Sequence, residues 1–205
     1  CGSPAATIRS CRVSWYPPSS TTTPISISSC HGRPMGSTPR AAWTRTARAS
    51  WAPRRRPASP PTVTPTSVYH GKQTEYTVTI LQVAGNWSLI VDLSGENETV
   101  GYLPGSLFTG LASNATVVGW GGNAQSSSGA GPPMGSGHGP DEGDGVAAYV
   151  ASIAVYDSKG NATAPAAGNV TSLTDAGDCY GASDYEVGKD DGGFFYYGGP
   201  QGCNH

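Results

Sequence analysis

The feature that most constrains this fold is a regular alternation of side chains near the middle of the 205-residue chain. In the segment 73–81 (QTEYTVTIL), every second residue from Tyr76 to Ile80 is apolar and the residues between them are polar. A period of two is typical of a strand with one buried face. An Ala-Gly-Asn turn signal at 84–86 separates this segment from a second apolar run at 87–93. The two strands are therefore predicted to form a hairpin.

Similar patterns predict four further strands and one helix. The segment 105–113 places apolar side chains at helical spacing, and its Ser106 is a residue type that caps helices. We therefore expect a short helix there. The chain is also rich in glycine, with 29 residues, which suits many turns. The sequence predicts an all-β fold, an antiparallel β-sandwich with one short helix. The further strands are expected at 99–104, 115–122, 145–157 and 193–199.

The longest predicted strand, 145–157, is expected to be regular. Strict alternation along a strand places every second side chain on the same face. One face is then formed by Ala147, Tyr149, Ala151, Ile153 and Val155.

Charge divides the chain into two parts. Residues 1–66 hold nine arginines and no Asp, Glu or Lys, whereas 67–205 hold all fourteen acids and only three lysines. The segment 1–66 is low in complexity and rich in Ser, Thr and Pro, so it is predicted to be disordered. Its arginine run at 54–56 has no interleaved aromatic platform, so no nucleic-acid binding is predicted. No run of 18 apolar residues is present, so no membrane span is predicted.

Glycosylation sequons indicate secretion to an extracellular or vacuolar compartment. Five Asn-x-Ser/Thr sequons occur in the second part of the chain, and the alternative is that loops rich in these residues produce them by chance. No signal peptide is visible at Cys1, so the chain is expected to be a fragment or a mature form. The five acceptor residues are Asn86, Asn97, Asn114, Asn161 and Asn169.

Cysteine usage agrees with an oxidising compartment. A bridge between Cys179 and Cys203 would close a loop of about 24 residues and stabilise the fold by ~3 kcal/mol. The other cysteines, at 1, 11 and 30, lack metal-ligand spacing. We therefore predict neither a metal nor a cofactor.

Four separated motifs carry a family resemblance. They are SVYHGKQTEYTVTILQVAGNWSLIV (67–91), VGYLPGSLFTGLASNATVVGWGG (100–122), PPMGSGHGPDEG (132–143) and the terminal CY with FFYYGGPQGC (179–203). In this order and spacing the segment 67–205 resembles the C-terminal half of the neprosin domain. The resemblance implies a plant secreted protein with a pair of antiparallel β-sandwiches. It also implies kinship with glutamic peptidases that cut beside proline.

The upstream half of that domain is not readable in residues 1–66. A shifted reading frame joins the last base of each codon to the first two bases of the next. That frame permits family-like sequence in three stretches, at 16–29, 29–36 and 40–51. We hypothesise that residues 1 to roughly 57 are an out-of-frame translation. The alternative is a genuine basic, proline-rich tail.

A glutamic peptidase needs two acids around one water, one as base and one as acid. The resemblance places the first glutamate upstream and the second directly after Trp-Gly-Gly, where this chain has Asn123. An amide cannot exchange a proton in that role, and Asn123 could equally be an ordinary turn residue. On the loop 137–143, Glu142 or Asp141 is a candidate substitute acid and His138 a candidate substrate contact. The alternative is a solvated, glycine-rich loop.

Three aromatic residues are candidates for binding a proline ring. Trp120, Tyr196 and Tyr197 could line a cleft, because aromatic faces suit proline, or they could be core residues. Two functions stay open for the chain. It is either an endopeptidase acting on proline-containing peptides or a non-catalytic secreted glycoprotein that keeps the fold without the acids.

Overall fold

A computed structural model describes most of the C-terminal two thirds of the chain and two short N-terminal stretches. The described residues are 7–14, 25–28, 65–92, 95, 97–108, 111, 115, 117–122, 131–157, 159–188 and 192–202. The helices among these residues are three-residue turns, and none of them could span a bilayer.

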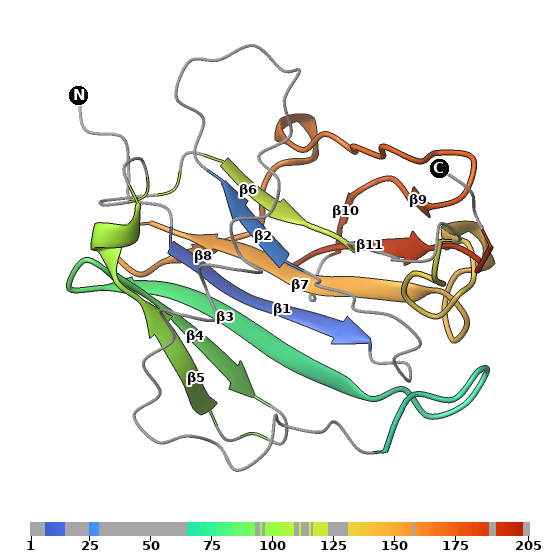
Figure 1. The fold of residues 1–205 in the computed structure, drawn as a ribbon, viewed down its shortest axis with the longest axis horizontal. Helices are drawn as coiled ribbons and strands as arrows, with labels where there is room; N and C mark the ends of the chain where they lie inside the picture. The colour runs from blue at the N-terminus through green and yellow to red at the C-terminus, as the bar shows by residue number, and fades with distance from the viewer. Residues whose placement is uncertain are drawn as a thin grey trace.

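The main element is a nine-stranded sheet in which every pairing is antiparallel (Figure 1). Its principal order is β10-β11-β7-β1-β3-β4-β5, with β8 paired to β7 and β9 paired to β11. The prediction of an antiparallel all-β fold is confirmed. The strands are β1 (Thr7–Ser14), β3 (Glu75–Val83), β4 (Asn86–Asp92), β5 (Asn97–Leu103), β7 (Ala148–Tyr156), β8 (Ala162–Thr163), β9 (Gly181–Ala182), β10 (Glu186–Val187) and β11 (Gly193–Gly198).

The predicted hairpin is β3 and β4. Val83 pairs with Asn86, so the connecting loop is the two residues Ala84 and Gly85. Both have positive φ, 48° and 77°, which is the backbone of the turns that match the twist of paired strands. Val78 and Ile80 are buried, as the alternation predicts.

The strand β7 departs from the predicted regular alternation. Ser152 has a φ of 54°, and the register between β7 and β11 shifts beside it. This irregularity lets Val150 and Ile153, three positions apart, pack in one buried cluster. The buried side chains of β7 are therefore Ala148, Val150 and Ile153, so that of the predicted face within this strand only Ile153 is fully buried.

Two stretches of the N-terminal segment are strands, which differs from the expectation of disorder for 1–66. The strand β1 lies between β3 and β7 in the centre of the large sheet and is antiparallel to both. Cys11 pairs with Val78 and Val13 pairs with Val150, and both partners belong to the core. Apart from residues 65 and 66, the rest of the segment lies outside the described residues. The reading-frame hypothesis therefore stays a prediction.

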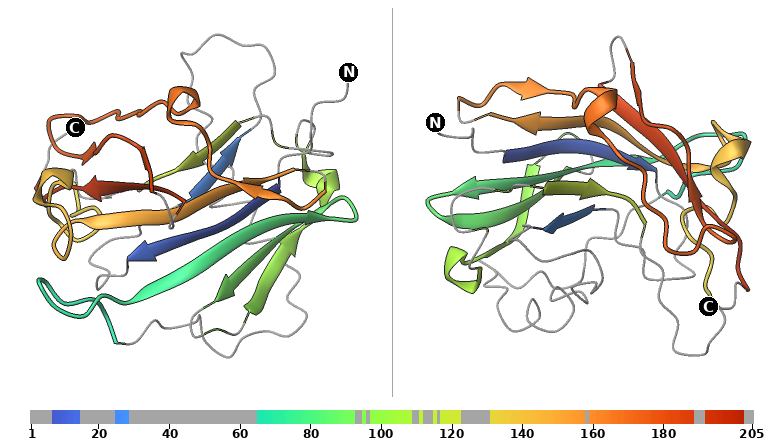
Figure 2. Two further views of the ribbon diagram at one scale, coloured as in Figure 1. Left: turned by 180° about the vertical axis from the view of Figure 1, so that it is seen from behind. Right: turned by 90° about the horizontal axis from the view of Figure 1, so that it is seen from above.

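A second, two-stranded sheet covers one face of the first. It consists of β2 (Ile25–Ser28) and β6 (Val117–Trp120), paired antiparallel, and Figure 2 shows it beside the large sheet rather than in its plane. Trp120 packs against both hydrophobic clusters of the core, and Val118 packs against one. Two sheets of such unequal size do not establish a full sandwich, so that part of the prediction stays open.

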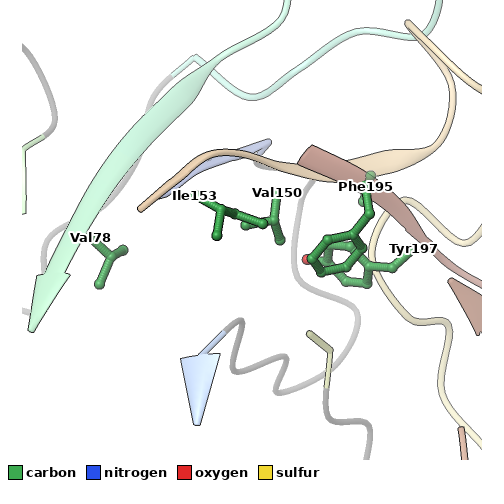
Figure 3. Close-up of a cluster of buried hydrophobic side chains, with 6 residues drawn as sticks. Val78, Val150, Ile153, Phe195 and Tyr197 are labelled. Carbon is green, nitrogen blue, oxygen red and sulfur yellow. The ribbon is translucent and has the colours of Figure 1, made fainter. Parts of the chain in front are cut away.

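The core consists of two clusters on the covered face of the large sheet. The first contains buried side chains from β3, β7 and β11, and Figure 3 shows them gathered below these strands. The second lies under the β3–β5 meander and includes Ile80, Trp87 and Leu103. Trp120 and Leu89 contact both clusters, so the two form a continuous apolar layer.

The predicted helix over 105–113 is wrong. The chain makes one 3-10 turn at Gly105–Leu107 and returns to extended backbone at Phe108, whose φ is −121°. Leu107 is largely exposed, whereas Leu111 is buried and Phe108 packs beside it in the second cluster. The helical spacing of the apolar residues therefore has another cause: individual side chains, Phe108 and Leu111, pack into the second cluster. Two further 3-10 turns lie at Pro140–Glu142 and Ala167–Asn169.

Candidate functional site

Three of the glycine-rich motifs meet at the end of β6. A Cβ atom on Gly122 would lie 2.6 Å from Met134 Sδ and 2.9 Å from Tyr197 Cε2. Met134 in turn pairs with Gly199 through a β-bridge just beyond β11. A side chain at 122 would clash with these neighbours, which explains why glycine is needed there. The MGSGH and YYGG segments therefore meet through backbone contacts, and Gly122 of the WGG segment packs against the side chains of Met134 and Tyr197.

Trp120 packs beside these segments. Its ring packs against both core clusters, and its Nε1 atom is buried without a hydrogen-bond partner among the described residues. A buried donor without an acceptor costs free energy, so the position of the ring is dictated by packing. Asn123, the position of the family's second glutamate, lies outside the described residues.

His138 and Glu142 form a pair on the adjacent loop. His138 Nδ1 lies 2.9 Å from each carboxylate oxygen of Glu142. The Gly139 backbone N–H donates to Glu142 Oε1 at 3.2 Å, at the start of the turn Pro140–Glu142. Both side chains are exposed to solvent. Glu142 therefore closes its own turn and orients the imidazole ring of His138.

A second loop, residues 67–74, packs against this pair. The ring of Tyr69 meets the ring of His138 edge-on, with a centroid distance of 4.8 Å. The Tyr69 hydroxyl donates to the Ser136 carbonyl at 2.6 Å, and the His70 N–H donates to the Gly145 carbonyl at 2.8 Å. The imidazole of His138 is thus held by Glu142 at Nδ1 and by Tyr69 at its side.

The opposite face of the large sheet carries a separate aromatic group. Tyr149 on β7 lies 6.2 Å, centroid to centroid, from Tyr196 on β11. The Tyr149 hydroxyl donates to Glu75 Oε1 at 2.5 Å. Burial, with the charges of Asp144 and Glu186, raises the pKa of Tyr196 above the usual tyrosine value.

The four predicted substrate contacts do not converge on one cleft. Successive residues of a strand face opposite ways, so Tyr196 lies on the aromatic face just described, while Tyr197 is buried in the first cluster with Trp120 against it. His138 alone is exposed among the glycine-rich segments. Sequence reasoning overlooked Tyr69, whose role depends on a contact with a loop 69 positions away that no local pattern reveals.

The predicted modification sites are distributed over loops and strand ends. Asn97, Asn161 and Asn169 are exposed, and Asn86 is half-buried, with its Oδ1 accepting from the Gly105 N–H at 3.3 Å. Asn114 and Cys203 lie outside the described residues, so the Cys179–Cys203 bridge stays a prediction. Among the residues that the structure describes, no group of three or more His, Cys, Asp or Glu could hold a metal ion.

The fold and the site together define a class of protein. It is an antiparallel β-sheet protein in which glycine-rich segments pack beside the rings of Trp120 and Tyr197. A family model described as Neprosin matches residues 56–200, which is most of the chain. The chain therefore belongs to the neprosin family. The match begins before Ser67, so the last residues of the basic segment belong to the family domain.

Proposed function

We propose that this chain is a secreted neprosin-family protein that binds proline-containing peptides without cleaving them. The resemblance relates it to glutamic endopeptidases that cut beside proline. Cleavage by that chemistry needs two carboxyl groups that share one water and differ in protonation. At the position aligned with the second glutamate the chain has Asn123, an amide that neither gives nor takes a proton in this role.

The observation that carries the proposal is the engagement of Glu142, the candidate substitute acid. Both of its oxygens lie 2.9 Å from His138 Nδ1, and Oε1 also accepts from the Gly139 N–H. A carboxylate used in this way caps its own turn and orients a neighbour. Because its oxygens contact His138 and the Gly139 N–H, we assign Glu142 a structural role.

The proposed peptide-binding surface is formed by the exposed side chains of Tyr69 and His138, where the loops 67–74 and 137–143 meet. Tyrosine faces pack well on proline rings, as in the grooves that recognise extended proline-rich peptides. Gly121 directly follows β6, and a Cβ at this position would meet no atom of the described residues within 4 Å. A ligand backbone could therefore approach the chain there without meeting a side chain.

The second candidate function is endopeptidase activity. It is favoured by the same pair, because a carboxylate within 2.9 Å of an imidazole can exchange a proton with it. In that case Glu142 would act as the acid or base and the chain would cleave proline-containing peptides in an acidic compartment.

One experiment separates the two candidates. The full chain is mixed with a proline-containing peptide at about pH 4, where family chemistry would operate. Binding is measured by calorimetry and cleavage by mass spectrometry. We expect binding without cleavage, weakened by Tyr69→Ala and unchanged by Tyr102→Ala, a half-buried tyrosine on β5. Cleavage that Glu142→Gln abolishes would establish the peptidase instead.

The extracellular or vacuolar location is part of the same proposal. It is supported by the exposed sequons at Asn97 and Asn169 and by the predicted bridge between Cys179 and Cys203. Peptide mass mapping with and without reduction would detect the bridge. Finding both cysteines as thiols in protein secreted by a eukaryotic cell would contradict it.

A further inference from the structure

The two ends of the large sheet differ in how they are protected. One end is β10, which has only two residues, Glu186 and Val187. The other end is β5, which has seven, Asn97–Leu103. Within the described part of the chain, β5 has β4 as its one strand neighbour. Its outer edge therefore presents a row of backbone N–H and C=O groups that can pair with another strand.

Apart from one bulge, where its register with β4 shifts between Thr99 and Gly101, β5 lacks the usual devices that protect such an edge. Its seven residues, NETVGYL, contain no lysine, arginine or proline and only one acid, Glu98. Short edge strands, lysines, prolines and bulges are the common ways of preventing edge-to-edge pairing. An antiparallel pairing of β5 with the same strand of a second copy would be two-fold symmetric, which is the geometry of a closed dimer.

One protective group is encoded at the start of this strand. Asn97, the first residue of β5, begins the sequon Asn97-Glu98-Thr99. Asn97 and Thr99 are both exposed. Asn97 pairs with Asp92 of β4 and Asp92 pairs with Thr77 of β3, so all three occupy the face of the sheet opposite the core.

The other described sequons are placed differently. Asn86 uses its Oδ1 to accept from the Gly105 N–H, and Asn161 uses its Nδ2 to donate to Asp157 at 2.8 Å. Asn169 is exposed in the turn Ala167–Asn169, which follows β8, a strand paired to β7 rather than to β5. Among these acceptors, Asn97 alone lies on the edge strand β5.

We propose that an N-linked glycan on Asn97 shields the β5 edge and prevents it from pairing with β5 of a second copy. This inference rests on the secretion that the proposed function includes. The glycosidic bond forms between Asn97 Nδ2 and the anomeric carbon of a lipid-pyrophosphate-linked oligosaccharide. Nδ2 loses one proton in this step, and the lipid pyrophosphate is the leaving group. A hydrated glycan at the first residue of the strand blocks the approach of a second strand.

Substitutions at Thr99 test the inference without changing Asn97. The full chain, carrying an added secretion signal, is produced by a eukaryotic cell, and glycopeptide mass spectrometry and light scattering are applied. Thr99→Ser keeps the sequon and is expected to stay monomeric. Thr99→Ala removes the glycan and is expected to shift the protein to dimers and larger species. Thr99→Lys also removes the glycan but adds an edge lysine, and is expected to restore the monomer.

Asn169→Gln is the control for losing a glycan elsewhere, and it is expected to remain monomeric. If Thr99→Ala unfolds, Asn97→Gln is measured in its place, with melting compared to wild type. A glycan-free β5 edge that stays monomeric overturns the inference. Glycans found at other sequons but not on Asn97 would overturn the inference and still agree with the proposed secretion. If no sequon is occupied, both the inference and the proposed secretion fail.

Discussion

The bulge at Ser152 leads to a sharp prediction about the core. With the bulge, Val150 and Ile153 both point into the first cluster, and both side chains are 0% exposed. In a regular strand, residues three positions apart lie on opposite faces. One of the two would then point away from the core. Truncating each residue to alanine therefore distinguishes the two arrangements.

The expected losses follow from the number of carbons removed. At about 0.8 kcal/mol per buried methylene, Ile153→Ala loses ~2.4 kcal/mol and Val150→Ala ~1.6 kcal/mol of transfer free energy. Incomplete collapse of the cavities increases both values, and large-to-small truncations of isoleucine in cores cost about 2–5 kcal/mol. Leu173→Ala is the control, because that side chain is 88% exposed and should change stability by less than about 0.5 kcal/mol.

Urea unfolding of the three variants and of the wild type measures these losses directly. For a chain of this size, a loss of about 3 kcal/mol also lowers the melting temperature by about 6–12 °C. The two core variants should show coupled effects when combined, since their side chains share a cluster. If either Val150→Ala or Ile153→Ala is as stable as the Leu173→Ala control, the bulge is wrong and β7 is a regular strand.

Two other regions give further predictions. Deleting residues 1–14 removes β1 from between β3 and β7, so the chain should aggregate and lose its cooperative melting transition. Deleting residues 1–6, which leaves β1 intact, should have neither effect. A 1–14 deletion that stays soluble and melts cooperatively would contradict the central place of β1. The pKa of Tyr196 is raised in the folded state, so its neutral phenol adds to the free energy of unfolding. This contribution is fully present below the ordinary tyrosine pKa and is lost as the pH rises through the pKa of Tyr196 in the folded protein. Replacing Asp144 and Glu186 by their amides should make Tyr196 ionise at lower pH in an ultraviolet absorbance titration, and an unchanged titration would exclude their influence.

The sequence predicts those elements whose pattern is local. The β3–β4 hairpin can be predicted from the sequence because the alternation of polar and apolar residues and the two-residue turn both lie within about twenty residues. The strand β1 is not, since arginines interrupt its apolar positions and its place depends on pairing with the distant strands β3 and β7. The segment 105–113 imitates a helix because single apolar residues of a loop happen to fall at helical spacing.

The candidate site is less predictable than the fold. The sequence singles out His138 and Glu142 because they lie on one short loop, and the structure places them 2.9 Å apart. The contact of Tyr69 with His138 depends on two loops meeting. Likewise, adjacent aromatic residues such as Tyr196 and Tyr197 cannot share a cleft once a strand turns them to opposite faces.

The central claim is that the chain binds proline-containing peptides and does not cleave them. The most direct measurement is mass spectrometry of such a peptide after long incubation with the purified full chain at about pH 4, beside calorimetry of the same mixture. We expect measurable binding and an intact peptide. Cleavage next to proline that Glu142→Gln abolishes would contradict it, because Glu142 would then supply the chemistry that its engagement with His138 and Gly139 argues against.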